Sequence, residues 1–184
     1  MISPARLGVN SSTASASFTG LPLIRSAVSF AFLGDVTDRC PEFKHRYEGF
    51  LQAHEQAGVA PNPTLQFEAQ GPETSGFEAT RHLLDSGQPF DAIVAASDLI
   101  AIGAIRCLHK AGLRVPEDVA VVGYDDIHAA RYLSPALTTV HQDTAAAADL
   151  LVDKLLRMID GESVDCELLP PALVVRGSCG GRDS

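Results

Sequence analysis

The sequence predicts an α/β fold in which helices cover both faces of a doubly wound parallel sheet. Short apolar runs rich in Val, Ile and Ala are bounded by Gly or Pro, as expected of strands buried on both faces. Helical patterns separate these runs, and such alternation favours a parallel sheet over a sandwich. With 184 residues, 46% of them hydrophobic, the chain can bury one substantial core, or two small ones if it contributes to two lobes.

The first part of the folded chain repeats a strand followed by a helix three times. Apolar residues recur at three- and four-residue spacing in the helical segments, and a glycine follows each of them. In order, the predicted elements are a strand at Val28–Leu33, a helix from Pro41 to about Ala57, a short strand at Thr64–Phe67, a helix from the segment GPETSGF to Gly87, a strand at Ala92–Ala96 and a helix at Leu99–Ala111.

The second part of the chain begins with a fourth buried strand, Val119–Val122, and continues through a short turn and a Thr-rich LTTV run. An Ala-rich helix then starts at Asp143 or Thr144 and runs through Ile159. Leu173–Val175 predicts the last strand. Five apolar residues of the Ala-rich helix are expected to face inward: Leu150, Leu151, Leu155, Leu156 and Ile159.

Both ends of the chain are expected to be poorly ordered. Residues 1–27 are rich in Ser and carry only Arg6 and Arg25 as charged side chains, so we interpret them as a remnant that precedes the folded part. An organelle transit peptide is the alternative interpretation, but the segment lacks an amphipathic Arg face. Residues 179–184 are Gly-rich and predict a frayed tail.

Composition excludes several classes of function. A net charge of −9 and a pI near 5.0 argue against nucleic-acid binding by this segment, because phosphate contacts need clustered Lys and Arg. No apolar run is long enough to cross a membrane. The four cysteines have neither CxxC spacing nor a His partner, which favours free thiols in the reducing cytoplasm over disulfides or a metal site. No phosphate-binding glycine motif indicates a cofactor.

Polar residues follow the third and fourth strands. In an open α/β sheet, ligands bind outside the carboxyl ends of the strands, where Tyr124, Asp125 and Asp126 are expected. Arg46 on the first helix is a partner for Asp125, since a guanidinium and a carboxylate can together hold the adjacent hydroxyls of a small polyol. Ser97 either caps the following helix or contacts ligand.

Two of these acids have competing interpretations. For Asp98 we favour capping of the helix over ligand contact. Asp125 and Asp126 could form a general acid/base pair or a divalent-metal site, but no third oxygen ligand or nearby base stands at a recognisable spacing. We therefore predict a binding protein with no catalytic and no metal-ligating residues.

Four ordered motifs resemble the effector-binding core of the LacI/GalR family of bacterial transcription regulators, which shares its fold with periplasmic sugar-binding proteins. Together they extend over about residues 28–178. The motifs are RYEGFLQAHEQAG, TSGFEATRHLL, FDAIVAASDLIAIGAIRCLHKAGLRVPEDVAVVGYDDIHAARYLSPALTTVHQD and LLPPALVVRGS.

The resemblance implies a type I periplasmic-binding-protein fold, in which ligand sits in a cleft between two subdomains. It places Arg46 and Asp125 at the positions that grip the ligand, with Ser97 at a position where the family uses a polar residue. Tyr124 and Gln142 line the same neighbourhood. The family also places an aromatic ring a few residues before the SGF motif, but this chain has Gly71 there, which argues against ring stacking on the ligand.

This chain departs from the family at its front, where it has no helix-turn-helix pattern and no room for most of the first subdomain. Residues 28–178 are therefore expected to form mainly the C-terminal subdomain, with 127–141 crossing to the other one. The expected protein is a cytoplasmic, self-associating or dimeric effector domain that binds a sugar or another small polar ligand and reaches DNA only through a headpiece outside this sequence. A transporter's solute-binding protein is the alternative, with an enzyme using Asp125 and Asp126 less favoured.

Overall fold

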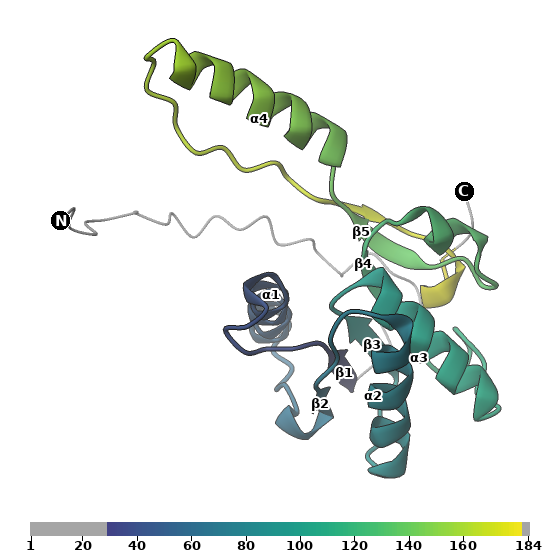
Figure 1. The fold of residues 1–184 in the computed structure, drawn as a ribbon. Coiled ribbons are helices and arrows are strands. Elements are labelled where there is room, and N and C mark those ends of the chain that lie inside the picture. The colour runs from purple at the N-terminus through teal and green to yellow at the C-terminus, as the bar shows by residue number, and fades with distance from the viewer. Residues whose placement is uncertain (1–28, 182–184) are drawn as a thin grey trace.

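The computed structural model describes residues 29–181, which form one six-stranded sheet in the order β2-β1-β3-β4-β5-β6 (Figure 1). Residues 1–28 and 182–184 lie outside the described part, so the prediction for 1–27 is not addressed by the structure. The strands are β1 (Phe30–Leu33), β2 (Gln66–Phe67), β3 (Ala92–Ala95), β4 (Ala120–Asp125), β5 (Thr138–His141) and β6 (Ala172–Val174). The α-helices are α1 (Pro41–Ala57), α2 (Glu73–Asp85), α3 (Asp98–Lys110) and α4 (Thr144–Ile159).

The predicted α/β class is confirmed, with one exception to parallel pairing. Strands β1 to β5 pair in parallel, whereas β6 runs antiparallel to β5. Helix α1 lies on one side of the sheet and α2 with α3 on the other (Figure 1). Each of the first three helices returns the chain to the same end of the sheet, so the strands that these helices connect run in the same direction. The chain enters β6 from α4 and a long connection, so its direction is free to reverse.

Two glycines set the distance between α2 and α3. A Cβ atom on Gly76 would clash with the backbone of Ile100, and one on Gly103 would clash with the backbone of Glu73. The two helices therefore touch backbone to backbone. The larger of two apolar clusters lies here and includes Leu83, from α2, and residues of α3 and the central strands.

Residues 127–141 belong to this sheet and its core, contrary to the prediction that they cross to another subdomain. A 3-10 helix, His128–Tyr132, leads into β5, which pairs with β4 along its whole length. Ala130 and Leu137 are fully buried in the main core. The crossing was expected from the family resemblance, but Thr138 and Thr139 of this segment are buried in the sheet, where their hydroxyls are hydrogen-bonded.

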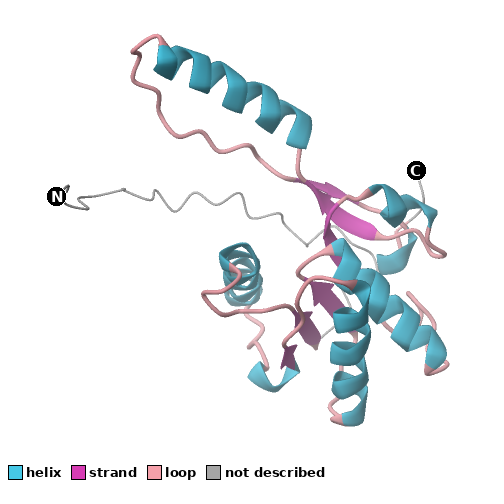
Figure 2. Cartoon of the chain, in the orientation of Figure 1, coloured by secondary structure: helices cyan, strands magenta, loops and turns pink. Residues whose placement is uncertain are grey.

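The segment that leaves the sheet is α4, whose predicted inward-facing side is wrong. The helix stands away from the sheet, and a long connection brings the chain back to β6 (Figure 2). No residue of α4 is buried, and Leu151 is 69% exposed. The 3.6-residue period correctly indicated an apolar face, but the described chain supplies nothing to cover it. Of the residues expected inward, Leu150 is half-buried and the others are exposed: Leu151, Leu155, Leu156 and Ile159.

The start of the Gly-rich tail is ordered by packing, not frayed. Residues Gly177–Cys179 form a 3-10 helix, and Cys179 is fully buried. Ser178 donates a hydrogen bond to the carbonyl of Val121 and accepts one from the amide of Thr138. These bonds fasten the chain end across β4 and β5. Among the described helices, none has the length and apolarity to cross a bilayer.

Candidate ligand-binding site

Arg46 joins three elements at the carboxyl edge of the sheet. It projects from α1, donates a hydrogen bond to the backbone carbonyl of Ala96 after β3, and forms an ion pair of 3.0 Å with Asp125 at the end of β4. Its guanidinium carbon lies 3.8 Å from the ring centroid of Tyr124, a stacked cation–π arrangement. The structure thus brings together three of the residues that the sequence singled out, across 79 positions of the chain.

Asp125 is presented by an unusual backbone. Its φ is 113°, and that of Asp126 is 51°, so two consecutive non-glycine residues lie in the left-handed region. Each such residue costs on the order of 1–3 kcal/mol and persists only where its surroundings hold it, often at a functional site. Gln142, just after β5, donates a hydrogen bond of 3.0 Å to the same Oδ1 atom that Arg46 contacts.

Opposing effects act on the pKa of the Asp125 carboxyl, and the raising effect of burial is the larger. Burial raises the pKa of its carboxyl above the ordinary value, while the charge of Arg46 and the hydrogen bonds from Gln142 and Arg46 oppose the shift. The hydrogen bonds from Arg46 and Gln142 both end on Oδ1, and the carboxylate is 32% exposed. Among the described residues, Oδ2 is therefore the oxygen left to accept a hydrogen bond from a ligand.

Ser97 caps helix α3, one of the two roles predicted for it, whereas Asp98 does not have the capping role that we predicted. Ser97 is the N-cap of α3, and its hydroxyl accepts from the amide of Ile100 at 3.4 Å. Asp98, for which we predicted capping, instead points into the core, where its carboxylate accepts bonds from the Thr139 hydroxyl at 2.6 Å and the Ile127 amide at 2.9 Å. Sequence alone could not separate them, since either residue type caps a helix.

Asp126 faces away from Arg46 and is held by a second arginine. Its carboxylate, 6% exposed, accepts a bond of 2.6 Å from Arg176 after β6, and Arg131 and His141 lie at 3.6 and 3.2 Å. Arg176 was missed in the sequence, because a single arginine after a short apolar strand carries no periodic signal. The two neighbouring acids therefore have separate cationic partners and do not form an acid/base pair with each other.

A third acid at the same edge was also missed. Asp35, directly after β1, is fully buried and accepts bonds from the Thr37 amide at 2.8 Å and the Gln70 amide group at 2.6 Å. The hydrogen bonds from Thr37 and Gln70 hold the pKa of its carboxyl below the ordinary value against the opposing effect of burial. Gly71, which follows Gln70 in the sequence, has a φ of 72°. An aromatic residue at this position would adopt that backbone conformation only with strain.

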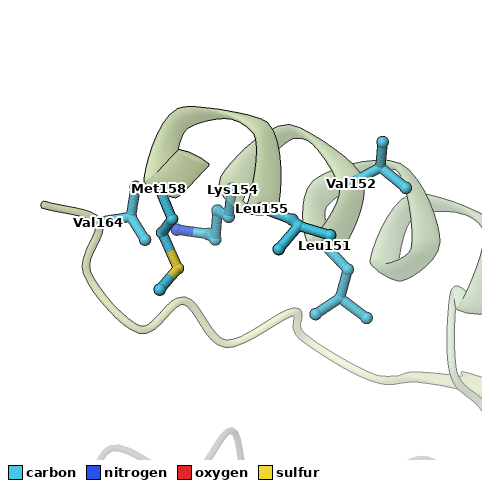
Figure 3. A pocket seen from close by; sticks show the side chains of 6 residues that line it. All are labelled: Leu151, Val152, Lys154, Leu155, Met158 and Val164. Carbon is cyan, nitrogen blue, oxygen red and sulfur yellow. The ribbon is translucent and has the colours of Figure 1, made fainter. Parts of the chain in front are cut away.

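No group of three or more His, Cys, Asp or Glu side chains within residues 29–181 is arranged to hold a metal ion. A separate apolar groove of about 410 Å³ lies between α4 and the connection that follows it (Figure 3). None of the predicted ligand-binding residues contributes to it. Its lining residues are Leu151, Val152, Lys154, Leu155, Met158 and Val164.

Comparisons with known proteins identify the domain to which this sheet belongs. The sequence profile described as "Periplasmic binding protein-like domain" matches residues 25–179. The HTH-type transcriptional repressor PurR of Pasteurella multocida is 37% identical over 137 residues, covering 73% of this chain and 41% of the relative. PurR of Haemophilus influenzae is 36% identical over 138 residues, with 72% and 41% covered. The chain thus spans well under half the length of the curated relatives it matches.

Solved structures give the same result. The Escherichia coli transcriptional repressor AscG superposes with a TM-score of 0.77 at 34% identity, covering 85% of this chain and 57% of the repressor. A complex of the transcriptional regulator CelR with cellobiose gives 0.79 at 34% identity, with 84% and 48% covered. The lac repressor dimer bound to operator gives 0.78 at 31% identity, with 85% and 54% covered. The chain belongs to the LacI family of transcription regulators and carries their periplasmic binding protein-like domain.

Proposed function

We propose that the carboxyl edge of this sheet binds a small polar effector, a sugar or a related metabolite, for a regulator of the LacI/GalR type. The observation that carries the proposal is the Arg46–Asp125 pair, held by Ala96 and Gln142 at the position where open α/β sheets bind ligands. The cellobiose in the CelR complex supports a sugar as the ligand class.

The pair favours a ligand with both hydrogen-bond donors and acceptors. Asp125 can accept from a hydroxyl through Oδ2, while the planar guanidinium of Arg46 can donate to a neighbouring oxygen. Tyr124 already has Arg46 over its ring, so we assign the ring to supporting the guanidinium and not to stacking on a sugar. Ser97 keeps its capping role in this proposal, and Gln142 fixes the carboxylate.

The remaining assignments follow from the same proposal. A net charge of −9 argues against phosphate contact by this domain, so we assign DNA contact to a separate headpiece of the regulator. We place such a regulator in the cytoplasm. Ligand binding and operator affinity would then be reciprocally coupled through two arrangements of the whole regulator. The exposed apolar face of α4 supports self-association of this chain, and the lac repressor structure is itself described as a dimer.

Calorimetry on the purified chain tests the binding proposal. Cellobiose is the first probe, followed by a panel of mono- and disaccharides and nucleobases, compared between the wild type, Arg46→Ala and Asp125→Asn. For a probe that binds, both substitutions are expected to weaken affinity about tenfold or more, since a hydrogen bond to a charged group is worth about 1.5–3 kcal/mol.

Lys44→Ala is the matched control for the arginine substitution. Lys44 lies on α1 near Arg46, but its ammonium pairs with Asp38 at the surface, so the variant should bind like the wild type. Unchanged affinity in Arg46→Ala, or equal losses in Arg46→Ala and Lys44→Ala, would contradict the assignment. Binding of no probe by folded wild-type chain would reject an autonomous effector site.

A further inference from the structure

A buried carboxylate lies directly behind the ligand-binding turn. Asp98, at the start of α3, is fully buried, and its two oxygens accept hydrogen bonds from different elements. Oδ1 accepts from the Thr139 hydroxyl of β5 and Oδ2 from the amide of Ile127, which directly follows the turn. One side chain therefore connects α3, β5 and the segment after β4.

The turn depends on such support because its backbone is strained. Asp125 and Asp126 have φ values of 113° and 51°, and the amides that follow this strained geometry are held from behind. The Asp126 amide donates to the Thr139 hydroxyl at 3.3 Å, and the Thr139 hydroxyl donates in turn to Asp98. The Ile127 amide donates directly to Asp98. Both amides thus depend on the same carboxylate.

Strand β4 is shaped to admit this carboxylate. A Cβ atom on Gly123 would clash with Oδ1 of Asp98, so only glycine lets the side chain approach the strand. The position of Asp98 is thereby specified from both sides, by the hydrogen bonds of Thr139 and Ile127 and by the absence of a side chain on Gly123.

We propose that Asp98 is a positioning residue for the effector site: it holds the strained turn through Thr139 and Ile127 and so directs Asp125 toward Arg46. The ligand itself belongs to the function proposed above, on which the binding consequence of this inference rests. The positioning of Asp125 does not need a ligand, and it can be measured without one.

The pKa of the Asp98 carboxyl reflects the same contacts and the charges nearby. Burial raises the pKa of its carboxyl to about 6, the bonds from Thr139 and Ile127 oppose the shift, and the nearby carboxylates of Asp125 and Asp126 add to it. Asp125 and Asp126 in turn lie close to four arginine and histidine side chains. These are Arg46 on α1, Arg131 in the 3-10 helix, His141 on β5 and Arg176 after β6.

The test compares Asp98→Asn with Asp118→Asn by NMR on the full chain without ligand. Asp118 pairs with Arg114 before β4, at the opposite end of the same strand, and serves as the matched control. Asp98→Asn turns one of the two accepting oxygens into an NH2 donor, so the side chain can no longer accept from both the Thr139 hydroxyl and the Ile127 amide. Hydrogen exchange of the Asp126 and Ile127 amides, which depend on these two bonds, should accelerate about tenfold or more. The carboxyl titration of Asp125 should shift at the same time, because its distance to Arg46 changes.

A second pair of variants covers poor folding of Asp98→Asn. Thr139→Val removes the hydroxyl between Asp98 and the Asp126 amide, so it should reproduce the faster exchange of the Asp126 amide and the shifted titration of Asp125. Thr139→Ser keeps the hydroxyl and should show wild-type exchange and titration. If Thr139→Val and Asp98→Asn leave the Asp126 and Ile127 amides and the Asp125 titration as they are in Asp118→Asn, the positioning role is overturned. If these changes occur but wild-type chain binds no probe, the positioning role stands and the proposed function fails.

Discussion

The carboxyl edge of the sheet and helix α4 both carry pairs of arginine and acidic side chains, but the pairs are largely buried at the edge and exposed on α4. At the edge, arginines and aspartates are largely buried, and each charge has a specific partner: Arg46 with Asp125, and Arg176 with Asp126. On α4, Arg157 pairs with Asp153 and Glu162 in solvent, beside leucines that are more than half exposed. The charges of the edge are thus paired by residues of this chain, whereas the apolar face of α4 is left exposed by the described residues.

The sharpest way to break this contrast is to remove one arginine from each region. Arg176→Ala leaves Asp126 buried and deprived of its closest cation, which should cost about 3–5 kcal/mol of unfolding free energy. Arg157→Ala removes an exposed pair and should cost less than about 1 kcal/mol. Urea unfolding followed by circular dichroism measures both. Similar losses of unfolding free energy in the two variants would contradict the distinction between a buried and an exposed ion pair.

The pH dependence of stability isolates the buried acid at the edge. Since the folded pKa of Asp98 is raised to about 6 from 3.8, the folded state binds the proton more tightly than the unfolded state between these values. Stability from this group is therefore present at low pH and is lost as pH rises through about 4 to 6. The difference in unfolding free energy between wild type and Asp98→Asn should fall by about 3 kcal/mol across that window. A flat difference curve would contradict the raised pKa.

The smallest stability effect is expected on α4. The double substitution Leu151→Glu with Leu155→Glu places charge where the side chains are already 69% and 57% exposed, so unfolding free energy should change by only about 0.5 kcal/mol. Its effect should appear in sedimentation velocity instead, as a larger monomer fraction than wild type. A monomeric wild-type chain, or a double variant that associates equally, would remove α4 from the self-association surface.

Local pattern was enough to predict most elements of the fold. Apolar runs and helical spacing indicated α1, α3 and β4 to within a few residues, because those elements bury the sides that their own periodicity marks. The same reasoning misjudged α4, since periodicity identifies an apolar face but not what covers it. The wrong expectation for 127–141 came from the family resemblance, and the buried, hydrogen-bonded hydroxyls of Thr138 and Thr139 show why this segment stays in the sheet.

The site could be predicted only in part from the sequence, because several of its contacts join segments that are far apart in the chain. The position of Asp125 followed from its place after a buried strand, and the chemistry of the two groups suggested Arg46 as its partner, but only the structure shows the ion pair between them. Arg176 and the inward turn of Asp98 depend on contacts between segments that no spacing rule connects. Ser97 and Asp98 differ in role although they are neighbours of similar chemistry, because only the structure shows which side chain faces the core.

The backbone contact between α2 and α3 has a consequence for how this site tolerates mutation. Any side chain larger than hydrogen at Gly76 or Gly103 would push α2 and α3 apart, which displaces α3 relative to its neighbours. The first turn of α3 carries Asp98, so such a shift would reach the Asp125 turn without touching a residue of the site. Random mutagenesis screened for loss of effector response should therefore return substitutions at these two glycines, although neither belongs to the effector site.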